Sequence, residues 1–216
     1  MRVIAGSLKG RRLKAPTWEG LRPTSDKLRE TLFNVLGPRV VGARVLDGFA
    51  GTGALGIEAI SRGAVEVVFV EQDRRAQALV AKNLAHCGIA LGYAILRATV
   101  ARGLEQLRAA PEFAPFDIVL LDPPYAIERP QAAPGGPVGH VGPVGRVTAG
   151  PSGAAGRGGE DLITVLTDVA PVMSPDGLVV LEHARRREPP EAAGPLVLRR
   201  TIASGDSALA FYTCRP

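Results

Sequence analysis

Residues 45–58 read VLDGFAGTGALGIE, and residues 51–56 within this stretch match the pattern G-x-G-x-x-G. An apolar run precedes the pattern, and apolar residues at helical spacing follow it. This order is typical of the strand, turn and helix that bind a nucleotide-type cofactor in open α/β sheets. The stretch therefore predicts the first strand, the cofactor turn and the first sheet-covering helix of an α/β fold.

The rest of the chain alternates between apolar runs and helical patterns. Runs rich in Val, Ile and Leu predict strands at 43–47, 65–71, 93–98, 116–122 and 177–183. Helical patterns separate them at 54–62, 73–86, 100–109 and 160–173. Strands of continuous apolar residues with helices between them predict a parallel sheet that is covered on both faces.

Two more strands are expected near the C-terminus, at 196–202 and 208–214. The link between them is too short for a parallel crossover, so they are expected to pair antiparallel. The sequence thus predicts a Rossmann-like α/β fold with a mostly parallel, seven-stranded sheet and a C-terminal antiparallel hairpin.

Residues 1–40 are expected to form a small extension before the α/β domain of residues 41–216. The runs 2–6 and 11–16 flank a turn-like interval and predict a β-hairpin. The apolar residues that follow repeat at helical spacing up to Gly37-Pro38, which predicts one helix.

One segment does not fit the alternating pattern. Residues 126–159 contain ten Gly and five Pro in 34 positions, with almost no large apolar side chain. Such a composition buries too little surface to offset the chain entropy, so we expect a disordered insertion. A lid over the neighbouring site is the alternative interpretation.

Basic residues gather at the start of the chain. The formal net charge is +5, and residues 1–44 hold ten Lys and Arg against three Asp and Glu. Residues 9–14 alone carry four cations. A basic end of this kind indicates a polyanion partner, and we interpret it as nucleic acid. A basic solvated surface without a partner is the alternative.

Several protein classes are not expected. The sequence holds no apolar run of the length of a membrane span and no secretory signal at its start. The two cysteines and three histidines are scattered, so no metal site is predicted. We expect a cytoplasmic protein that does not bind membranes, and a monomer because no apolar stripe suggests a dimer.

Asp47 bears on which cofactor the glycine turn binds. It ends the first predicted strand and would bring an ionised carboxylate to the rim of the turn. A dinucleotide places its pyrophosphate there, and like charges at close range disfavour each other. S-adenosylmethionine (SAM), which carries an ammonium and a sulfonium, suits such a site better. Glu71 ends the second strand and could accept both ribose hydroxyls in either cofactor family.

The sequence DPPY at 122–125 ends the fourth predicted strand. The two prolines have no backbone N–H, so the acceptors are the Asp122 carboxylate and the Pro123 carbonyl. Such acceptors suit an exocyclic amine with two N–H donors, and Tyr125 could stack on the planar base that carries it. We therefore predict an enzyme that methylates the amine of a nucleobase.

The motifs DGFAGTG, FVEQD and DPPY resemble those of amino-methyltransferases that act on nucleic-acid bases. The N-terminal sequences RVIAGSLKGRRLKAP and RPTSDKLRETLFNVL narrow this resemblance to the RsmD family. These bacterial enzymes methylate the N2 amine of one guanine in 16S ribosomal RNA. The resemblance implies a class I SAM-dependent methyltransferase fold, with 16S rRNA or the assembling small ribosomal subunit as partner.

The resemblance also implies roles for individual residues. The acceptor base would be held by Asp122, Pro123, Pro124 and Tyr125. The SAM cofactor would be held by Asp47, Phe49, Ala50, Gly51, Gly53, Glu71, Gln72, Thr99 and Asp122. The RNA would be contacted by Arg2, Lys9, Arg11, Arg12, Lys14, Arg22, Lys27 and Arg29. The target guanine would have to be unstacked to reach the site.

Other functions are weighed against this one. A DNA methyltransferase acting on adenine N6 or cytosine N4 would share DPPY, although no separate target-recognition domain is visible. A non-catalytic RNA-binding protein on the same scaffold would be expected to lose Asp47, Glu71 or DPPY. A nicotinamide oxidoreductase would not be expected to carry Asp47 and DPPY.

Overall fold

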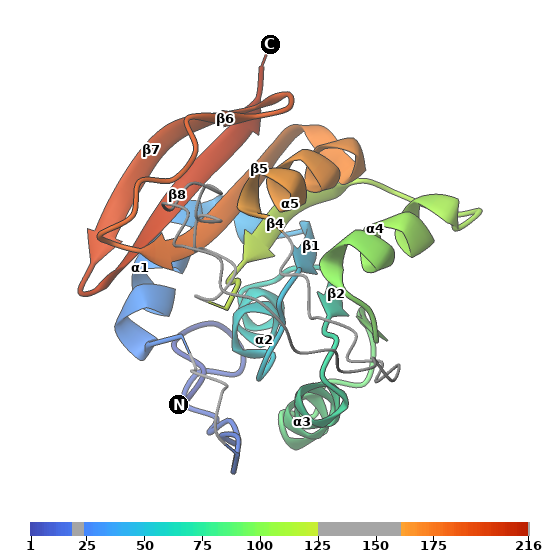
Figure 1. Cartoon of the computed structure of the whole chain (residues 1–216). Coiled ribbons are helices and arrows are strands. Elements are labelled where there is room, and N and C mark those ends of the chain that lie inside the picture. Colours follow the sequence, from blue (N-terminus) through green and yellow to red (C-terminus); the bar gives the residue numbers. More distant parts are fainter. Residues whose placement is uncertain (19–23, 125–160, 216) are drawn as a thin grey trace, which may run out of the picture.

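The computed structural model describes residues 1–18, 24–124 and 161–215. Within these ranges the strands form one eight-stranded sheet with the order β3-β2-β1-β4-β5-β8-β7-β6 (Figure 1). Strands β1 to β5 are parallel, whereas β8, β7 and β6 continue the sheet antiparallel. The bounds are β1 Arg44–Asp47, β2 Glu66–Val70, β3 Tyr93–Leu96, β4 Phe116–Leu121, β5 Met173–Ala184, β6 Ala192–Ala193, β7 Leu196–Ser204 and β8 Ser207–Cys214.

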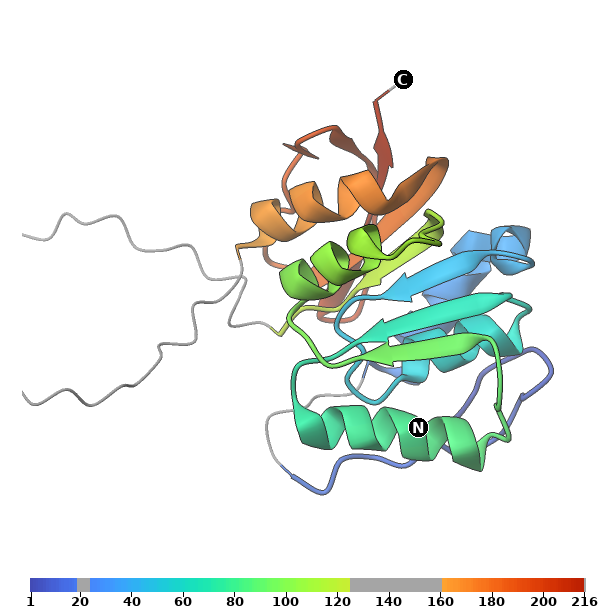
Figure 2. The ribbon, with the colours of Figure 1, turned by 90° about the vertical axis from the view of Figure 1, so that its right-hand side faces the viewer.

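Helices cover both faces of the sheet (Figure 2). Buried side chains of α1, α2 and α3 pack on one face, and those of α4 and α5 pack on the other. The bounds are α1 Asp26–Leu36, α2 Ala54–Ser61, α3 Arg74–His86, α4 Val100–Ala109 and α5 Leu162–Val169, with short 3-10 turns at Gly37–Val40 and Ala170–Val172. None of the described helices is long and apolar enough to span a membrane.

The predicted fold class is confirmed, since all seven expected strands and the helices between them are present. The eighth strand, β6, is only two residues long and pairs at the edge of the sheet with β7. So short a strand has no periodicity that a sequence pattern could reveal. The Gly/Pro-rich segment 126–159 lies outside the described residues.

The expected N-terminal hairpin forms only in part. A single antiparallel bridge joins Arg2 to Arg12, and no regular strand flanks it. Residues 1–14, here called the N-terminal loop, instead form several hydrogen bonds with α2. Glu58 accepts from the amides of Ile4 and Ala5 at 2.7 and 3.0 Å, and Ser61 Oγ accepts from a third amide of the loop.

The N-terminal loop is also part of the hydrophobic core. Val3 and Leu13 are buried in the same apolar cluster as α1, α2 and α3. Gly6 has φ +81°, and a Cβ added there would lie 1.8 Å from the carbonyl oxygen of Ser61. The chain approaches α2 so closely that only glycine fits at this point. The extension therefore folds against the α/β domain and shares its core.

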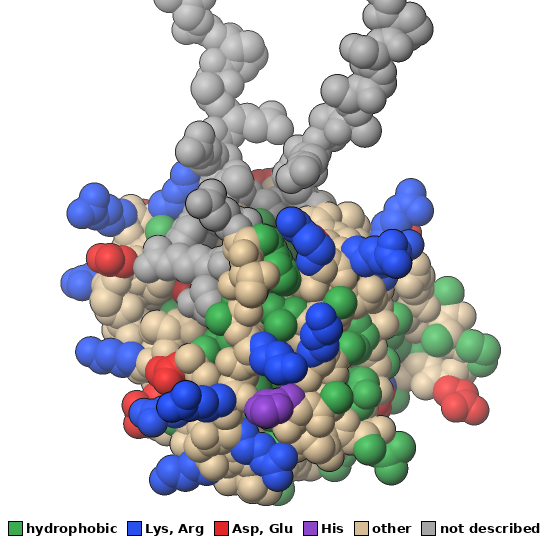
Figure 3. Space-filling model, turned by 90° about the horizontal axis from the view of Figure 1, so that it is seen from below, with side chains coloured by type: hydrophobic (Ala, Val, Ile, Leu, Met, Phe, Trp, Pro, Cys, Tyr) green, Lys and Arg blue, Asp and Glu red, His purple; other side chains and the backbone are tan. Residues whose placement is uncertain are grey.

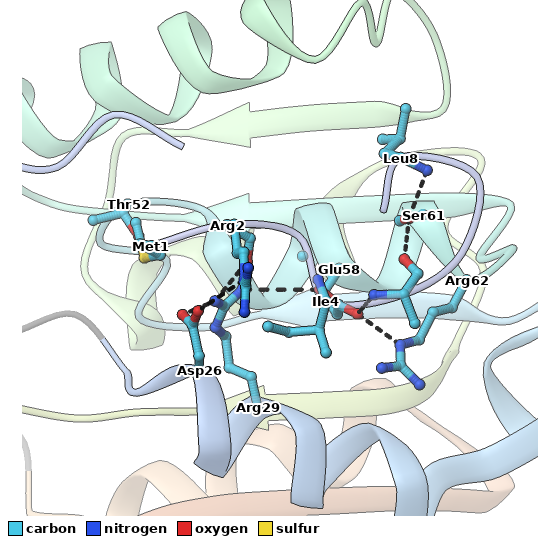
Figure 4. Close-up of polar contacts among 12 residues, drawn as sticks. Met1, Arg2, Ile4, Leu8, Asp26, Arg29, Thr52, Glu58, Ser61 and Arg62 are labelled. Carbon is cyan, nitrogen blue, oxygen red and sulfur yellow. Dashed lines mark hydrogen bonds and ion pairs between the residues drawn. The ribbon is translucent and has the colours of Figure 1, made fainter. Parts of the chain in front are cut away.

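Arg29 corrects one expectation from the sequence. We expected Arg29 to contact RNA, but its side chain is fully buried where α1 packs near α2 (Figure 4). Its Nη2 donates to the carbonyl of Arg2 and to Asp26, each at 2.7 Å, and its Nη1 lies 3.8 Å from Glu58. The cation offsets the buried charge of Glu58, because an unpaired carboxylate in the core would be costly.

This network predicts a large effect of Arg29→Met on stability. The variant leaves Arg62 as the one cation paired with the buried Glu58 among the described residues, so we expect a loss of about 3 kcal/mol in the free energy of unfolding. Urea unfolding measures this loss. Lys27→Met, an exposed position on the same helix, serves as the matched control and should change stability by less than about 0.5 kcal/mol. Equal losses in the two variants would contradict the assignment.

Candidate cofactor and acceptor site

Three carboxylates meet at the C-terminal edge of the parallel strands. Asp47 is the last residue of β1, Glu71 follows β2, and Asp122 follows β4. These strands are neighbours in the sheet, in the order β2-β1-β4. An open α/β sheet presents its ligand site at this edge. The sequence motifs that were recognised separately therefore lie together.

The glycine turn has the backbone that its sequence predicts. Gly51 and Gly53 adopt positive φ values of 53° and 77°, which residues with a side chain rarely adopt. Gly56 serves a different need, because a Cβ there would lie 2.2 Å from the ring of Phe69 on β2. The first two glycines shape the turn, and the third lets α2 pack closely on the sheet. Ala50, within the turn, is buried, and Phe49 packs against the opposite core cluster.

Asp47 is more deeply placed than the sequence suggested. We expected an ionised group at the rim, but the residue is completely buried. Burial raises the pKa of Asp47 to about 7; a hydrogen bond from the Gly56 amide at 3.0 Å opposes this rise, and repulsion by Asp122 and Glu71 adds to it. Its Oδ1 has no hydrogen-bond partner within the described residues. A buried oxygen without a partner is rare in folded proteins, and it makes Asp47 a candidate ligand-binding residue.

Glu71 joins the glycine turn to the start of α3. Its Oε2 accepts from the Gly51 amide at 2.9 Å, and its Oε1 accepts from the Asp73 amide at 2.8 Å. Each carboxylate oxygen keeps a second lone pair for a ligand hydroxyl. The binding of ribose stays a prediction, as does a contact from Gln72, which is exposed beside it.

Thr99 has a local structural role. Its side chain caps the N-terminus of α4 and accepts from the Arg102 amide at 3.4 Å. A threonine before a helix is a common cap, so this role needs no cofactor. The predicted contact with the adenine of SAM stays a prediction.

At the acceptor motif, Asp122 is half-buried, Pro123 is buried and Pro124 is exposed. Tyr125 lies outside the described residues. The hydroxyl of Thr24 donates to Oδ2 of Asp122 at 2.6 Å. The contact between Thr24 and Asp122 was not predicted from the sequence. The two residues are 98 positions apart, and the pattern around Thr24 indicates only the start of a helix.

The donor set of the site fits SAM. Glu71, Asp122 and, when it is ionised, Asp47 place negative charge beside a turn whose positive φ values favour glycine. This arrangement favours a ligand with a cationic group and disfavours a phosphate. Among the described residues, no group of His, Cys, Asp and Glu is arranged to hold a metal ion.

The expected RNA contacts are mostly exposed. The exposed ones are Arg2, Lys9, Arg11, Arg12, Lys14 and Lys27. Arg22 lies outside the described residues, and Arg29 is buried as described above. Arg11 also donates to the Cys87 carbonyl at the end of α3, at 2.8 Å, so it helps to hold the N-terminal loop in place.

Helix α3 carries further exposed basic residues, which were not among the expected RNA contacts. The N-terminal loop lies against this helix, since the backbone of Lys14 exchanges hydrogen bonds with the Asn83 side chain at 2.8 and 3.2 Å. Arg74 and Lys82 are exposed on the same helix. Figure 3 shows Lys and Arg side chains spread over the lower face of the molecule, where the N-terminal loop and α3 lie in Figure 1. We call the exposed cations of this loop and helix the basic face.

Known proteins share much of this sequence. Residues 1–133 match the family described as "Conserved hypothetical protein 95". YlbH of Bacillus subtilis, which is named as a candidate rRNA methyltransferase, is 35% identical over 215 residues and covers 100% of both chains. Ribosomal RNA small subunit methyltransferase D of Escherichia coli is 43% identical over 125 residues, which are 58% of this chain and 60% of that protein.

Solved structures share the fold. That of yhhF, a candidate methyltransferase from Escherichia coli, has a TM-score of 0.71 and 29% sequence identity, covering 100% of this chain and 98% of that one. A candidate RNA methyltransferase from Pyrococcus horikoshii, at 16% identity, has a TM-score of 0.63 and shows the fold alone. The match over the first 133 residues and the full-length relative together show that this chain belongs to the RsmD family.

Proposed function

We propose that this protein transfers a methyl group from SAM to the exocyclic N2 amine of a guanine in 16S rRNA. The main observation that supports this proposal is that Asp47, Glu71 and Asp122 lie close together beside the glycine turn. The relatives add the substrate class, because several are named as methyltransferases of small-subunit ribosomal RNA.

The cofactor side of the site is formed by β1, β2 and the turn. When bound, SAM supplies an electrophilic methyl group on a positively charged sulfur. Asp47 and Glu71 provide negative charge and hydrogen-bond acceptors for such a ligand. The backbone of Gly51 and Gly53 leaves room for it to lie close to the chain.

On the acceptor side, Asp122 and the Pro123 carbonyl orient the amine. The lone pair of a guanine N2 is delocalised into the ring, so the amine is a weak nucleophile. Hydrogen bonds from its two N–H groups to these acceptors return electron density to nitrogen and fix its direction. Positioning of this kind can lower a barrier by about 7–11 kcal/mol.

The basic face would hold the RNA near the site. Cations that neutralise phosphates give affinity that does not depend on sequence and that falls with salt. The target guanine would be unstacked into the site, at least cost from an unpaired loop.

The raised pKa of Asp47 predicts that SAM affinity rises with pH. A cationic ligand favours the ionised carboxylate, so binding releases the proton that Asp47 holds below about pH 7. Affinity should therefore increase by at most about tenfold per pH unit below about pH 7 and level off above it, where Asp47 is already ionised in the free protein. Calorimetric titration in two buffers of different ionisation enthalpy measures both the affinity and the protons released.

Asp47→Asn is the control for this titration, because it keeps an acceptor for the Gly56 amide but does not ionise. S-adenosylhomocysteine, which lacks the sulfonium charge, should show a weaker pH dependence. If Asp47→Asn keeps the pH slope of the unmodified protein, Asp47 is not the group that titrates.

The reaction itself is tested with labelled SAM and three acceptors: unmethylated small ribosomal particles, naked 16S rRNA and duplex DNA. We expect N2-methylguanosine from a ribosomal substrate when the products are identified by mass. Asp122→Ala should lower the rate at least about 100-fold while cofactor still binds. Asp176→Ala, an exposed position on β5, should not change it. Methylated DNA bases, or normal turnover of Asp122→Ala, would refute the proposal.

The double variant Lys9→Ala/Arg12→Ala tests the basic face. We expect weaker binding of rRNA fragments and a smaller salt dependence, with the slope of log K against log salt reduced by about 1.4–1.8. Arg11 is left unchanged because it also anchors the loop to α3.

The control for charge is Arg108→Ala/Arg215→Ala, which removes two exposed cations from α4 and from the end of β8. It should keep the RNA affinity, and both double variants should keep the SAM affinity. Equal losses of RNA binding in the two would argue for a general charge effect and against a specific basic face.

A further inference from the structure

Thr24 links the N-terminal extension to the acceptor motif. Its hydroxyl donates to Oδ2 of Asp122 at 2.6 Å, which is the length of a strong hydrogen bond to a charged oxygen. Thr24 lies just before Ser25, the N-cap of α1, whereas Asp122 follows the end of β4. The contact therefore joins two elements that meet only in the folded protein.

Thr24 is held in place by the first turn of α1. Ser25, the next residue, caps the helix by accepting from the Leu28 amide at 3.1 Å. Asp26 is bound to the buried Arg29 at 2.7 Å. Leu28 is itself buried in the core. The hydroxyl of Thr24 is thus presented from a well-anchored turn rather than from a free loop.

The same turn is connected to the N-terminal loop. Arg29 donates to the carbonyl of Arg2, and Asp26 lies 3.6 Å from the guanidinium of Arg2 (Figure 4). The start of α1 therefore contacts the basic face on one side and Asp122 on the other.

The orientation of Asp122 matters for the proposed chemistry. An ionised carboxylate is an acceptor only, and its plane can turn about the side-chain bonds. A short hydrogen bond to Oδ2 restricts this rotation and thereby the direction in which the carboxylate can accept from an amine. Methyl transfer needs the amine nitrogen in line with the sulfur–methyl bond, so a turned carboxylate would slow the reaction.

We propose that Thr24 is a positioning residue that orients the Asp122 carboxylate for the acceptor amine. This inference rests on the proposed function, in which Asp122 receives that amine. Thr24 acts through Asp122 and does not itself contact the reacting atoms. Loss of its hydroxyl is therefore expected to affect the rate of transfer more than the binding of either substrate.

The test compares Thr24→Val, which removes the hydroxyl at nearly constant volume, with Thr24→Ser, which keeps it. Methyl transfer is measured with the acceptor that the unmodified protein methylates. Thr24→Val should lower kcat about 10- to 100-fold, with KM for RNA and Kd for SAM changed by less than about threefold. Thr24→Ser should retain most of the activity.

Thr31→Val is the matched control, because Thr31 lies on α1 and its hydroxyl bonds only the Lys27 carbonyl, at 3.0 Å, among the contacts described. The Thr31→Val variant should have the kcat of the unmodified protein and an unfolding temperature similar to that of Thr24→Val. Normal kcat in Thr24→Val would overturn the inference. So would equal losses in Thr24→Val and Thr24→Ser, since the serine keeps the donor.

A structural readout separates this inference from the proposed function. If the unmodified protein methylates none of the acceptors, the proposed function fails, whatever Thr24 does. Crystal structures of the unmodified protein and Thr24→Val then decide the role of Thr24 alone. A rotated or disordered Asp122 carboxylate in the variant supports the inference, and an unchanged orientation refutes it.

Discussion

The close packing of α2 on β2 is the constraint on which the rest of this structure depends. It is possible only because position 56 has no side chain, since a Cβ there would overlap the ring of Phe69. The amide of Gly56 can then reach Asp47, and the turn at the start of the helix lies over the ends of β1 and β2. The other end of the same helix presents Glu58 and Ser61, which bind the N-terminal loop. One helix thus positions both the glycine turn and the N-terminal loop.

The site carries an electrostatic cost that the free protein does not offset. Asp47 is buried, has a pKa near 7 and has one oxygen without a hydrogen-bond partner among the described residues. Glu58 is buried as well, but Arg29 and Arg62 lie beside it. Glu58 is therefore paired with cations within the core, whereas the buried Asp47 forms no ion pair with a cation among the described residues. Functional sites often contain buried charged or unpaired polar groups that the rest of a fold avoids.

Much of the fold was predictable because its signals are local. Apolar runs rich in Val, Ile and Leu identified every strand except the two-residue β6, and the glycine pattern placed the turn between β1 and α2. The two-residue β6 and the reduced N-terminal hairpin were not predictable, because neither has a periodicity of its own. The hairpin is replaced by bonds to α2, which depend on where that helix lies.

The sequence by itself determined the α/β class, the glycine turn and the positions of Asp47, Glu71 and Asp122 at strand ends. Each of these follows from the order of neighbouring residues along the chain. Only the tertiary structure decided that Arg29 lies in the core and that Thr24 reaches Asp122. A charged residue on a helix has the same local pattern whether it faces solvent or a buried carboxylate. Burial and long-range hydrogen bonds are properties of packed surfaces, and no short stretch of sequence contains both partners.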